Sequence, residues 1–188
     1  MNVDNFIEFA RTVGKLKETK RTGWVKDAGL KHPESVADHS FRTSVLAMLL
    51  SDEAGLDTEK VMRLALLHDL EESITGDIIR SEKEAMDEQE RYSMELEAFK
   101  KVVADLPESI RKKYIELWKE SYEGKTREAM LVKSIDRVEQ AVQAQEYGDK
   151  YPDNKILALF TDENDLEIVS PETEKIIKRL LELKKNYE

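Results

Sequence analysis

Cysteine is absent from the sequence of 188 residues. Disulfide bonds and thiolate metal sites are therefore excluded, and the composition suits a reducing compartment. Glycine and proline are scarce, with seven and four residues. An all-β sandwich needs turn residues about every 8 to 12 positions, so this scarcity argues against one. We therefore expect an all-α protein.

Long apolar runs and a basic excess are also missing. No apolar run approaches the roughly 18 residues of a membrane-spanning helix, and residues 1–11 are acidic and amphipathic, unlike a signal peptide. We expect a cytoplasmic protein that does not enter a membrane. The 40 acidic and 30 basic residues give a formal net charge of -10. Without a local basic patch, such a chain repels a nucleic-acid backbone, so we expect no nucleic-acid partner.

The composition that is present favours amphipathic helices. Charged residues make up 37% and hydrophobic residues 40% of the chain, a mixture typical of helices with charged outer faces. The length suits one domain with a sizeable core. We predict a single-domain helical bundle over residues 1–188, with about six to eight helices. The helices are predicted at residues 4–17, 35–54, 57–75, 81–105, 106–123, 126–147 and 171–187.

Two of these helices are predicted to be central to the core. The first, capped by Asp4, carries an apolar stripe at helical spacing: Phe6, Ile7, Phe9, Ala10, Val13 and Leu16. The second carries the apolar run Val45, Leu46, Met48, Leu49 and Leu50. The charged helix at 81–105 is interpreted as a solvated face. Residues 18–34 show no clear period and are interpreted as a long loop.

The stretch from Leu64 to Asp77 carries polar residues on an apolar run. In a helix, His68, Asp69 and Glu72 would lie beside its leucines, because residues three or four apart are about one turn apart. Ionisable groups beside apolar surface are costly unless they are paired or bind a metal. The cluster therefore needs a partner elsewhere in the chain.

Two of the three histidines lie in predicted buried helices beside an aspartate, as Asp38-His39 and His68-Asp69. A single histidine on an apolar face is more often a hydrogen-bonded core residue, and that alternative stays open here. Asp136 is the acid embedded in the apolar stripe of a third helix. Two imidazoles and two carboxylates suit a divalent ion such as Mn, Co, Fe, Ni or Zn. Helical bundles place such sites between facing helices.

Three further residues are candidates for contact with an anionic substrate. In the loop at 18–34, the guanidinium of Arg21 can hold a phosphate and the indole of Trp24 can stack on a base. Packing and surface roles remain the alternative for both. Arg42 is a second candidate phosphate contact, although we expect it to form a structural ion pair with an acid.

The spacing of these residues resembles the HD-domain metal-dependent phosphohydrolase superfamily. The strings that carry the resemblance are Arg21-Thr-Gly-Trp24-Val, Pro33-Glu-Ser-Val-Ala-Asp-His39 and His68-Asp-Leu-Glu-Glu72-Ser-Ile-Thr-Gly-Asp77. They are similar to the branch of that superfamily that contains the YfbR-type 5'-deoxynucleotidases. The matching blocks lie within residues 21–77, with a looser match near Asp136, so the motif core covers about 21–140.

The resemblance implies a role for each matched residue. His39, His68, Asp69 and Asp136 would bind a divalent metal, with Mn, Co or another transition metal as the cofactor. Glu72 would move a proton between water and leaving group, and Asp77 would orient the water or a sugar hydroxyl. Arg21 would hold the phosphate of a nucleotide substrate, and Trp24 would pack against its sugar or base. The resemblance also implies a homodimer, for which the helix at 81–105 or the last helix offers a surface.

Three alternatives to a 5'-deoxynucleotidase stay open. The substrate of such a phosphohydrolase could be a nucleoside triphosphate, a cyclic dinucleotide or guanosine tetraphosphate. The chain could instead be a non-catalytic module that binds metal or nucleotide, for which a proton-handling acid such as Glu72 has no use. The third alternative is a scaffold in which the polar cluster is a buried ion network.

Overall fold

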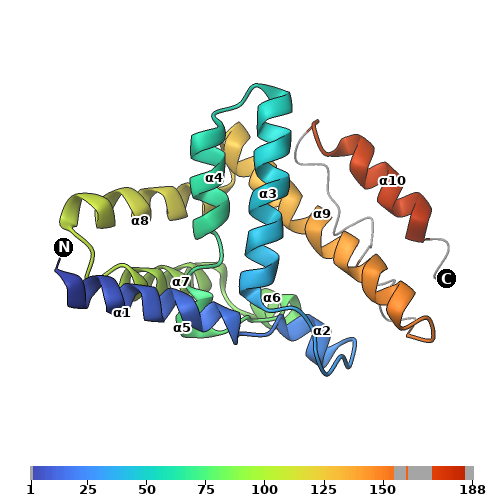
Figure 1. The fold of residues 1–188 in the computed structure, drawn as a ribbon, viewed down its shortest axis with the longest axis horizontal. Helices are drawn as coiled ribbons and strands as arrows, with labels where there is room; N and C mark the ends of the chain where they lie inside the picture. The colour runs from blue at the N-terminus through green and yellow to red at the C-terminus, as the bar shows by residue number, and fades with distance from the viewer. Residues whose placement is uncertain (1, 155–159, 161–170, 185–188) are drawn as a thin grey trace. The chain divides into compact units, whose positions relative to one another are not determined.

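In the computed structural model, the described residues are 2–154, 160 and 171–184. Their regular structure is helical, apart from one isolated antiparallel bridge between Lys20 and Ser35. The all-α prediction is confirmed. The elements in chain order (Figure 1) are α1 (Val3–Gly14), η1 (Lys15–Lys17), α2 (Thr22–Lys26), α3 (Val36–Ala54), α4 (Thr58–Leu67), α5 (Glu72–Thr75), α6 (Arg80–Ala85), α7 (Glu88–Val102), α8 (Glu108–Glu123), α9 (Arg127–Lys150) and α10 (Glu174–Lys184).

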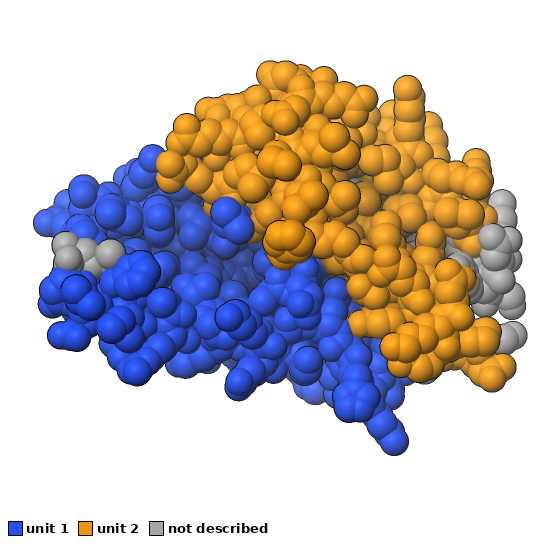
Figure 2. Space-filling view, viewed as in Figure 1, with its two compact units in different colours: residues 1–40, 66–122 blue, residues 41–65, 123–188 orange. Residues whose placement is uncertain are grey.

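The chain divides into two compact units, each built from two separate stretches of sequence (Figure 2). Unit 1 comprises residues 1–40 and 66–122, and unit 2 comprises residues 41–65 and 123–188. Because each unit is discontinuous in sequence, neither corresponds to a separate segment of the chain. The single domain stays a prediction.

The core of unit 1 is built around aromatic side chains of α7 and α8. Phe99 and Trp118 stack with their ring centroids 5.5 Å apart, and both are almost completely buried. The short α5 contacts both α1 and α7, beside which it lies in Figure 1. The buried apolar cluster of this unit consists of Leu16, Val36, Leu67, Leu70, Phe99, Val102, Val103, Leu106 and Trp118.

In unit 2, α10 packs against α9. One buried apolar cluster of this unit consists of Val138, Ala141, Ile177 and Leu180. In the same unit, the guanidinium of Arg42 lies 2.7 Å from the fully buried Glu139 carboxylate and 2.8 Å from that of Glu146. Arg42 is therefore the structural ion-pair residue that we expected.

The first helix is less buried than predicted, although Phe9 and Val13 of its stripe pack against the core cluster of unit 1. None of the residues of α1 is buried, and Phe6 keeps 54% of its surface exposed. Leu16, which follows in η1, is the buried member of the predicted stripe. The helix is capped by Asn2, whose side-chain oxygen accepts a hydrogen bond from Asn5 N at 2.7 Å, and the predicted cap at Asp4 is wrong.

Of the predicted apolar run of α3, Leu50 alone is buried. Val45, Met48 and Leu49 are exposed, whereas the buried positions on this part of the helix are Thr43, Ser44, Ala47, Leu50 and Ser51. Apolar residues occupy more than one face of α3, so apolarity alone does not identify the side that packs. Small and hydroxyl side chains form most of the buried face.

The predicted boundaries are wrong in two places. The predicted helix at 81–105 divides into α6 and α7, since the Asp87 side chain accepts hydrogen bonds from Gln89 N and Glu90 N and so starts a new helix. The predicted loop at 18–34 contains the short helix α2.

The C-terminal part is close to its prediction. Helix α9 continues beyond the predicted end to Lys150, and α10 begins at Glu174, three residues after its predicted start. Residues 185–187 of the predicted last helix lie outside the described residues. Among the residues that the structure describes, no helix has the length and apolar character needed to cross a membrane.

Candidate metal centre and substrate site

The stretch that follows α4 is a tight turn. Helix α4 ends at Leu67, and Glu72 N donates a hydrogen bond to Asp69 O at 3.2 Å, a carbonyl only three residues back. Bonds of this kind wind the chain more tightly than an α-helix. Leu67 and Leu70 are both buried and anchor the turn. His68 and Asp69 therefore lie in a turn fixed by two leucines, and their predicted place on a helix is wrong.

His39 is placed by the start of α3. Ser35 donates from both N and Oγ to Asp38 Oδ2, at 2.9 and 2.7 Å, and Asp38 N donates to Ser35 Oγ at 3.2 Å. This reciprocal pattern is a capping box, and its bonds from the Ser35 backbone and side chain lower the pKa of Asp38. Asp38 is thus occupied with the helix end, while the next residue, His39, is fully buried.

Three ligand-type side chains of unit 1 converge. Asp69 Oδ2 lies 3.2 Å from His68 Nε2 and 3.7 Å from His39 Nε2, and the two imidazole centroids are 5.6 Å apart. Within the described part of the chain, Asp69 Oδ2 is buried and makes no hydrogen bond. Donors about 2.0–2.1 Å from one ion and spread around it lie roughly 3.0–3.4 Å from each other. The separation of His68 Nε2 and Asp69 Oδ2 therefore fits a shared cation, and His39 Nε2 lies just beyond that range.

The ionisation state of Asp69 suits a metal ligand. Burial raises the pKa of its carboxyl, but the imidazole of His68, the guanidinium of Arg21 and the imidazole of His39 outweigh burial and hold that pKa well below its usual range. Arg21 NH1 is 3.6 Å from Asp69 Oδ2. Asp69 is therefore an ionised carboxylate, the form that binds a metal.

Asp136, the fourth predicted ligand, lies on α9 and belongs to unit 2. Its side chain keeps 25% of its surface exposed, and its Oδ2 lies 4.0 Å from Arg137 Nε. Its neighbours Ile135 and Val138 are buried, so Asp136 borders the apolar face of α9, as the sequence predicts. A shared ligand set with the three residues of unit 1 stays a prediction.

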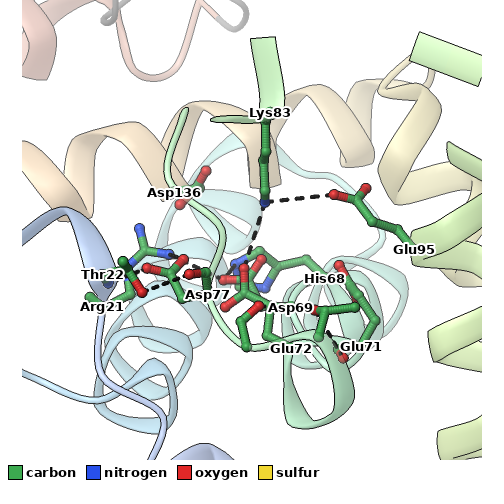
Figure 3. A network of polar contacts seen from close by, with 12 residues as sticks. Arg21, Thr22, His68, Asp69, Glu71, Glu72, Asp77, Lys83, Glu95 and Asp136 are labelled. Atoms are coloured by element: carbon green, nitrogen blue, oxygen red, sulfur yellow. Dashed lines mark hydrogen bonds and ion pairs between the residues drawn. The ribbon is translucent and has the colours of Figure 1, made fainter. Parts of the chain in front are cut away.

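Glu72 opens α5 and is buried (Figure 3). Burial, then the negative charges of Asp69 and Asp77, raise the pKa of Glu72 well above its usual value, against the opposing effect of Arg21 and Lys83. A carboxyl group with a raised pKa can carry a proton near neutral pH, as a general acid or base must. The side chain is thus chemically distinct from the ionised Asp69 beside it.

Lys83 and Glu95 belong to this site, although the sequence interpretation assigned both to a solvated face. Lys83 Nζ lies 3.6 Å from Glu72 Oε1 and 3.8 Å from Glu95 Oε1, and Glu95 is buried. The interpretation of 81–105 as a solvated face is wrong at these two positions. A signal was present in the sequence: Glu95 shares helical spacing with the buried residues Ala98, Phe99 and Val102 of α7.

Glu71 is a second acid that the sequence interpretation missed. Its Oε2 accepts a hydrogen bond from Trp118 Nε1 at 2.8 Å. Burial, followed by the charge of Asp69, raises the pKa of Glu71 to about 8. The indole of α8 therefore fixes the residue that directly precedes Glu72, and so supports the turn.

Arg21 and Asp77, both predicted site residues, are brought together. Arg21 NH1 lies 3.5 Å from Asp77 Oδ1, Thr22 N donates to Asp77 Oδ2, and Thr22 Oγ1 donates to Asp77 O at 2.6 Å. Gly76 precedes Asp77 with φ 73° and ψ 167°, a combination that only glycine adopts readily. This backbone turn aims Asp77 at the start of α2, so the loop carrying Arg21 is tied to the turn carrying Asp69 (Figure 3).

Trp24 is less accessible than a substrate contact would require. Only 1% of its surface is exposed, and its Nε1 donates a hydrogen bond to Glu34 Oε1 at 3.0 Å. These observations favour the packing role that the sequence left open. A contact with the sugar or base stays a prediction for Trp24.

A family model described as the HD domain matches residues 13–179. This range covers most of the chain and contains the four predicted metal ligands. The chain belongs to the HD-domain family. The family that the motifs indicated is confirmed, and the buried His39 and the adjacent His68 and Asp69 are the histidines and aspartate that carried the resemblance.

The HD-domain chain has named relatives over most of its length. It is 41% identical over 145 residues to human 5'-deoxynucleotidase HDDC2, covering 77% of this chain and 69% of the relative. It is 38% identical over 164 residues to 5'-deoxynucleotidase HDDC2 of Dictyostelium discoideum, covering 82% and 84%. A conserved hypothetical protein from Pyrococcus furiosus shares the fold, with a TM-score of 0.75, 32% identity and coverage of 94% and 99%.

Proposed function

We propose that the chain is a metal-dependent 5'-deoxynucleotidase, which hydrolyses deoxyribonucleoside 5'-monophosphates to deoxyribonucleosides and phosphate. The observation that carries the proposal is the convergence of His39, His68 and Asp69, with the buried Glu72 one turn further along the chain. The relatives named 5'-deoxynucleotidase, which match most of the chain, support this substrate class.

The proposed metal ligands are His39, His68, Asp69 and Asp136. Imidazole and carboxylate donors accept borderline divalent ions, so we propose Mn, Co or another transition metal. The 3.2 and 3.7 Å separations around Asp69 Oδ2 support the part of the set that lies in unit 1. Asp136 enters the set through the sequence motif.

The proposed reaction breaks the bond between phosphorus and the 5'-oxygen of the sugar. When bound, a divalent cation acidifies water and neutralises negative charge on the phosphate. Glu72 takes the proton from the attacking water and delivers it to the departing 5'-oxygen, which leaves as a hydroxyl group. The raised pKa of Glu72 suits a residue that holds this proton between the two steps.

The loop beside the turn supplies the substrate contacts in this proposal. Arg21 binds the phosphate, because a guanidinium offers two parallel donors to phosphate oxygens. Asp77 lies 3.5 Å from Arg21 NH1, holds Thr22 by two hydrogen bonds, and orients the water or a sugar hydroxyl. Trp24 stays the proposed contact with the sugar or base, which requires its indole, buried in this structure, to become exposed when substrate binds.

Phosphate release from a panel of nucleotides tests the proposal. The purified chain is stripped with chelator, reloaded with Mn or Co, and assayed on deoxyribonucleoside and ribonucleoside monophosphates. We expect turnover of the deoxyribonucleotides, its loss in His68→Ala, and full activity in His32→Ala, because His32 is exposed. No release from any monophosphate at saturating metal would refute the proposal.

The same panel separates the alternatives. Nucleoside triphosphates, a cyclic dinucleotide and guanosine tetraphosphate are included, and preference for one of these would assign a different HD-domain phosphohydrolase. Bound metal or bound nucleotide without any turnover would identify a non-catalytic module. Absence of retained metal after dialysis would favour a scaffold.

We also propose that the chain forms a cytoplasmic homodimer. Helix α3 carries a row of exposed apolar residues at helical spacing, which suits a contact with a second copy: Phe41, Val45, Met48 and Leu49. This row is a better candidate surface than the helix at 81–105, whose apolar residues Leu96 and Phe99 pack against or within the core of unit 1. Fractionation of the native cell tests the location.

A further inference from the structure

We propose that Lys83 is a positioning residue of this site, which holds one carboxylate oxygen of Glu72 so that the other oxygen faces the reacting water. The inference rests on the proposed function, because it assigns Lys83 a role through Glu72. Lys83 lies outside every motif string that identified the family.

The two oxygens of Glu72 have different surroundings. Lys83 Nζ lies 3.6 Å from Oε1. Oε2 is buried and has no hydrogen-bond partner within the residues that the structure describes. Oε1 therefore lies beside the Lys83 ammonium, and Oε2 remains available for the reacting water. This is the arrangement that a proton-transferring carboxylate needs.

Lys83 is itself held by a second acid. Glu95 Oε1 lies 3.8 Å from Lys83 Nζ, in a different direction from Glu72 (Figure 3). Glu95 is buried on α7, Lys83 comes from α6, and Glu72 opens α5. Carboxyl groups from α5 and α7 thus converge on the ammonium group of α6. An ammonium is a compact charge on a flexible stem, so it can serve two carboxylates without one fixed bonding direction.

The charge of Lys83 is maintained by these neighbours. Burial lowers the pKa of its ammonium, but the carboxylates of Glu72, Asp69 and Glu95 outweigh burial and raise that pKa. The side chain keeps only 30% of its surface exposed, so an ammonium without acids nearby would be costly there. The position favours a cation because the acids are present.

The two cations of the site, Arg21 and Lys83, lie beside different acids. Arg21 lies 3.6 Å from Asp69 and 3.5 Å from Asp77, whereas Lys83 lies beside Glu72 and Glu95. Arg21 is thus associated with a proposed metal ligand and the substrate loop, and Lys83 with the proposed proton carrier. Loss of Lys83 should therefore affect the chemical step more than substrate or metal binding.

Steady-state kinetics of Lys83→Met test the inference. We expect kcat for a deoxyribonucleoside monophosphate to fall roughly 10- to 100-fold, the usual effect of removing a residue that orients an active group. KM and the amount of metal retained after dialysis should stay within about threefold of wild type, since neither contact is removed. Lys83→Arg, which keeps the charge, should restore part of kcat.

Lys26→Met is the matched control. Lys26 Nζ forms an exposed ion pair with Glu82 Oε1 of α6 at 2.6 Å, so its loss removes a different cation that contacts the same helix. We expect wild-type kcat for this variant. An equal loss of kcat in Lys26→Met and Lys83→Met would assign the effect to the docking of α6 and would overturn the inference.

A double-variant cycle with Glu95 separates a positioning role of Lys83 from a purely structural role. Glu95→Gln should lower kcat in the wild-type background and have little further effect in Lys83→Met, because it acts through the ammonium. Additive losses would contradict this. Lys83→Gln, which keeps a polar group of similar length, replaces Lys83→Met if the methionine variant does not fold.

The outcomes separate the inference from the proposed function. Absence of turnover by the wild-type chain would refute the proposed function. Turnover by wild type with an unchanged kcat in both Lys83→Met and Lys83→Gln would refute the role of Lys83 and leave the proposed function standing. A large rise in KM with unchanged kcat would make Lys83 a substrate contact and would also overturn the inference.

Discussion

The acids around the turn after α4 are held in different ways. Glu71 accepts the indole hydrogen of Trp118, and Asp77 accepts the backbone hydrogen of Thr22. Asp69 stays ionised beside two imidazoles, whereas the pKa of Glu72 is raised. Acids close together in sequence thus differ in their partners and in the direction of their pKa shifts, because burial and nearby charges act on each one differently.

Replacement of Glu72 tests its assignment as the proton carrier. Glu72→Gln keeps the size of the side chain but cannot take a proton from water, so we expect kcat to fall about 10²- to 10⁴-fold. Metal retained after dialysis, measured by elemental analysis, should equal that of wild type. Glu84→Gln on α6 is the control, because Glu84 is exposed and pairs with Arg80. Unchanged turnover would remove Glu72 from the mechanism, and lost metal would make it a ligand.

The buried Glu95 predicts a pH dependence of stability. Burial raises its pKa above the usual 4.5, against the opposing charges of Lys83 and Arg91. The folded chain then retains a proton that the unfolded chain releases, so this stabilising contribution is present below pH 4.5 and is lost as pH rises through the folded pKa. Glu95→Gln lacks the titration. We expect its free energy of unfolding, relative to wild type, to increase between pH 4.5 and neutrality.

Glu97→Gln is the control for this measurement by urea unfolding in chelator. Glu97 lies on the same helix, is exposed, and pairs with Lys100, which lowers its pKa. Its stabilising contribution is present above the unfolded pKa and is lost as pH falls. The difference between Glu97→Gln and wild type should therefore change in the opposite direction with pH. A common direction for both variants would contradict burial as the cause at Glu95.

At the scale of elements, sequence periodicity identifies the long helices and misses the ends that depend on one side chain. Helix α8 ends at Glu123 before Gly124, as predicted, because glycine readily takes the φ of 65° found there. The break before α7 depends on two hydrogen bonds to Asp87, which reads as one more charge in a charged run. Propensity and pattern do not show which acid will cap a helix.

The residues of the candidate site also differ in whether the sequence could identify them. His39, His68 and Asp69 could be selected from the sequence, because ligand-type side chains are conspicuous beside apolar residues. Lys83 and Glu95 could not be selected by type, because charged residues are abundant in this chain and only the fold shows which of them turn inward. The proposed roles of Lys83 and Glu95 therefore rest on their neighbours in the fold.

Two glycines offer a matched test of the backbone before Asp77. A Cβ at Gly76 or Gly14 would meet no atom within 4 Å. Gly76 has φ 73° and ψ 167°, so Gly76→Ala should destabilise the chain by about 1–3 kcal/mol and lower kcat. Gly14 has the helical φ of -60°, so Gly14→Ala should stabilise the chain by about 0.5–1 kcal/mol. Urea unfolding measures both, and a shared sign would contradict the strain assigned to Gly76.

At the scale of the whole molecule, metal binding should raise the melting temperature. An ion at one hundred times its Kd stabilises the folded chain by about 2.7 kcal/mol. We expect Mn or Co to raise the Tm of chelated protein, and Asp136→Asn to reduce this shift. Asp149→Asn is the control, because Asp149 is exposed on the same helix. An undiminished shift in Asp136→Asn would remove Asp136 from the ligand set.

The proposed dimer predicts a mass of twice the 21.8 kDa chain. Phe41 keeps 71% of its surface exposed on the apolar row of α3, so Phe41→Asp should give a monomer by light scattering without loss of helical circular dichroism. Ile110→Asp on α8 is the control, because Ile110 is exposed and lies outside that row. A dimer that survives Phe41→Asp would place the contact elsewhere.

The bridge between Lys20 and Ser35 has a consequence for how the protein can change over evolutionary time. Arg21 N donates to Glu34 O at 3.2 Å, and Val36 N donates to Thr19 O at 2.8 Å. The two ends of the segment that carries α2 are therefore joined to each other. Each doubling of the length of a closed loop costs only about 0.6 kcal/mol. Insertions in this segment are therefore compatible with an unchanged start of α3, where His39 lies.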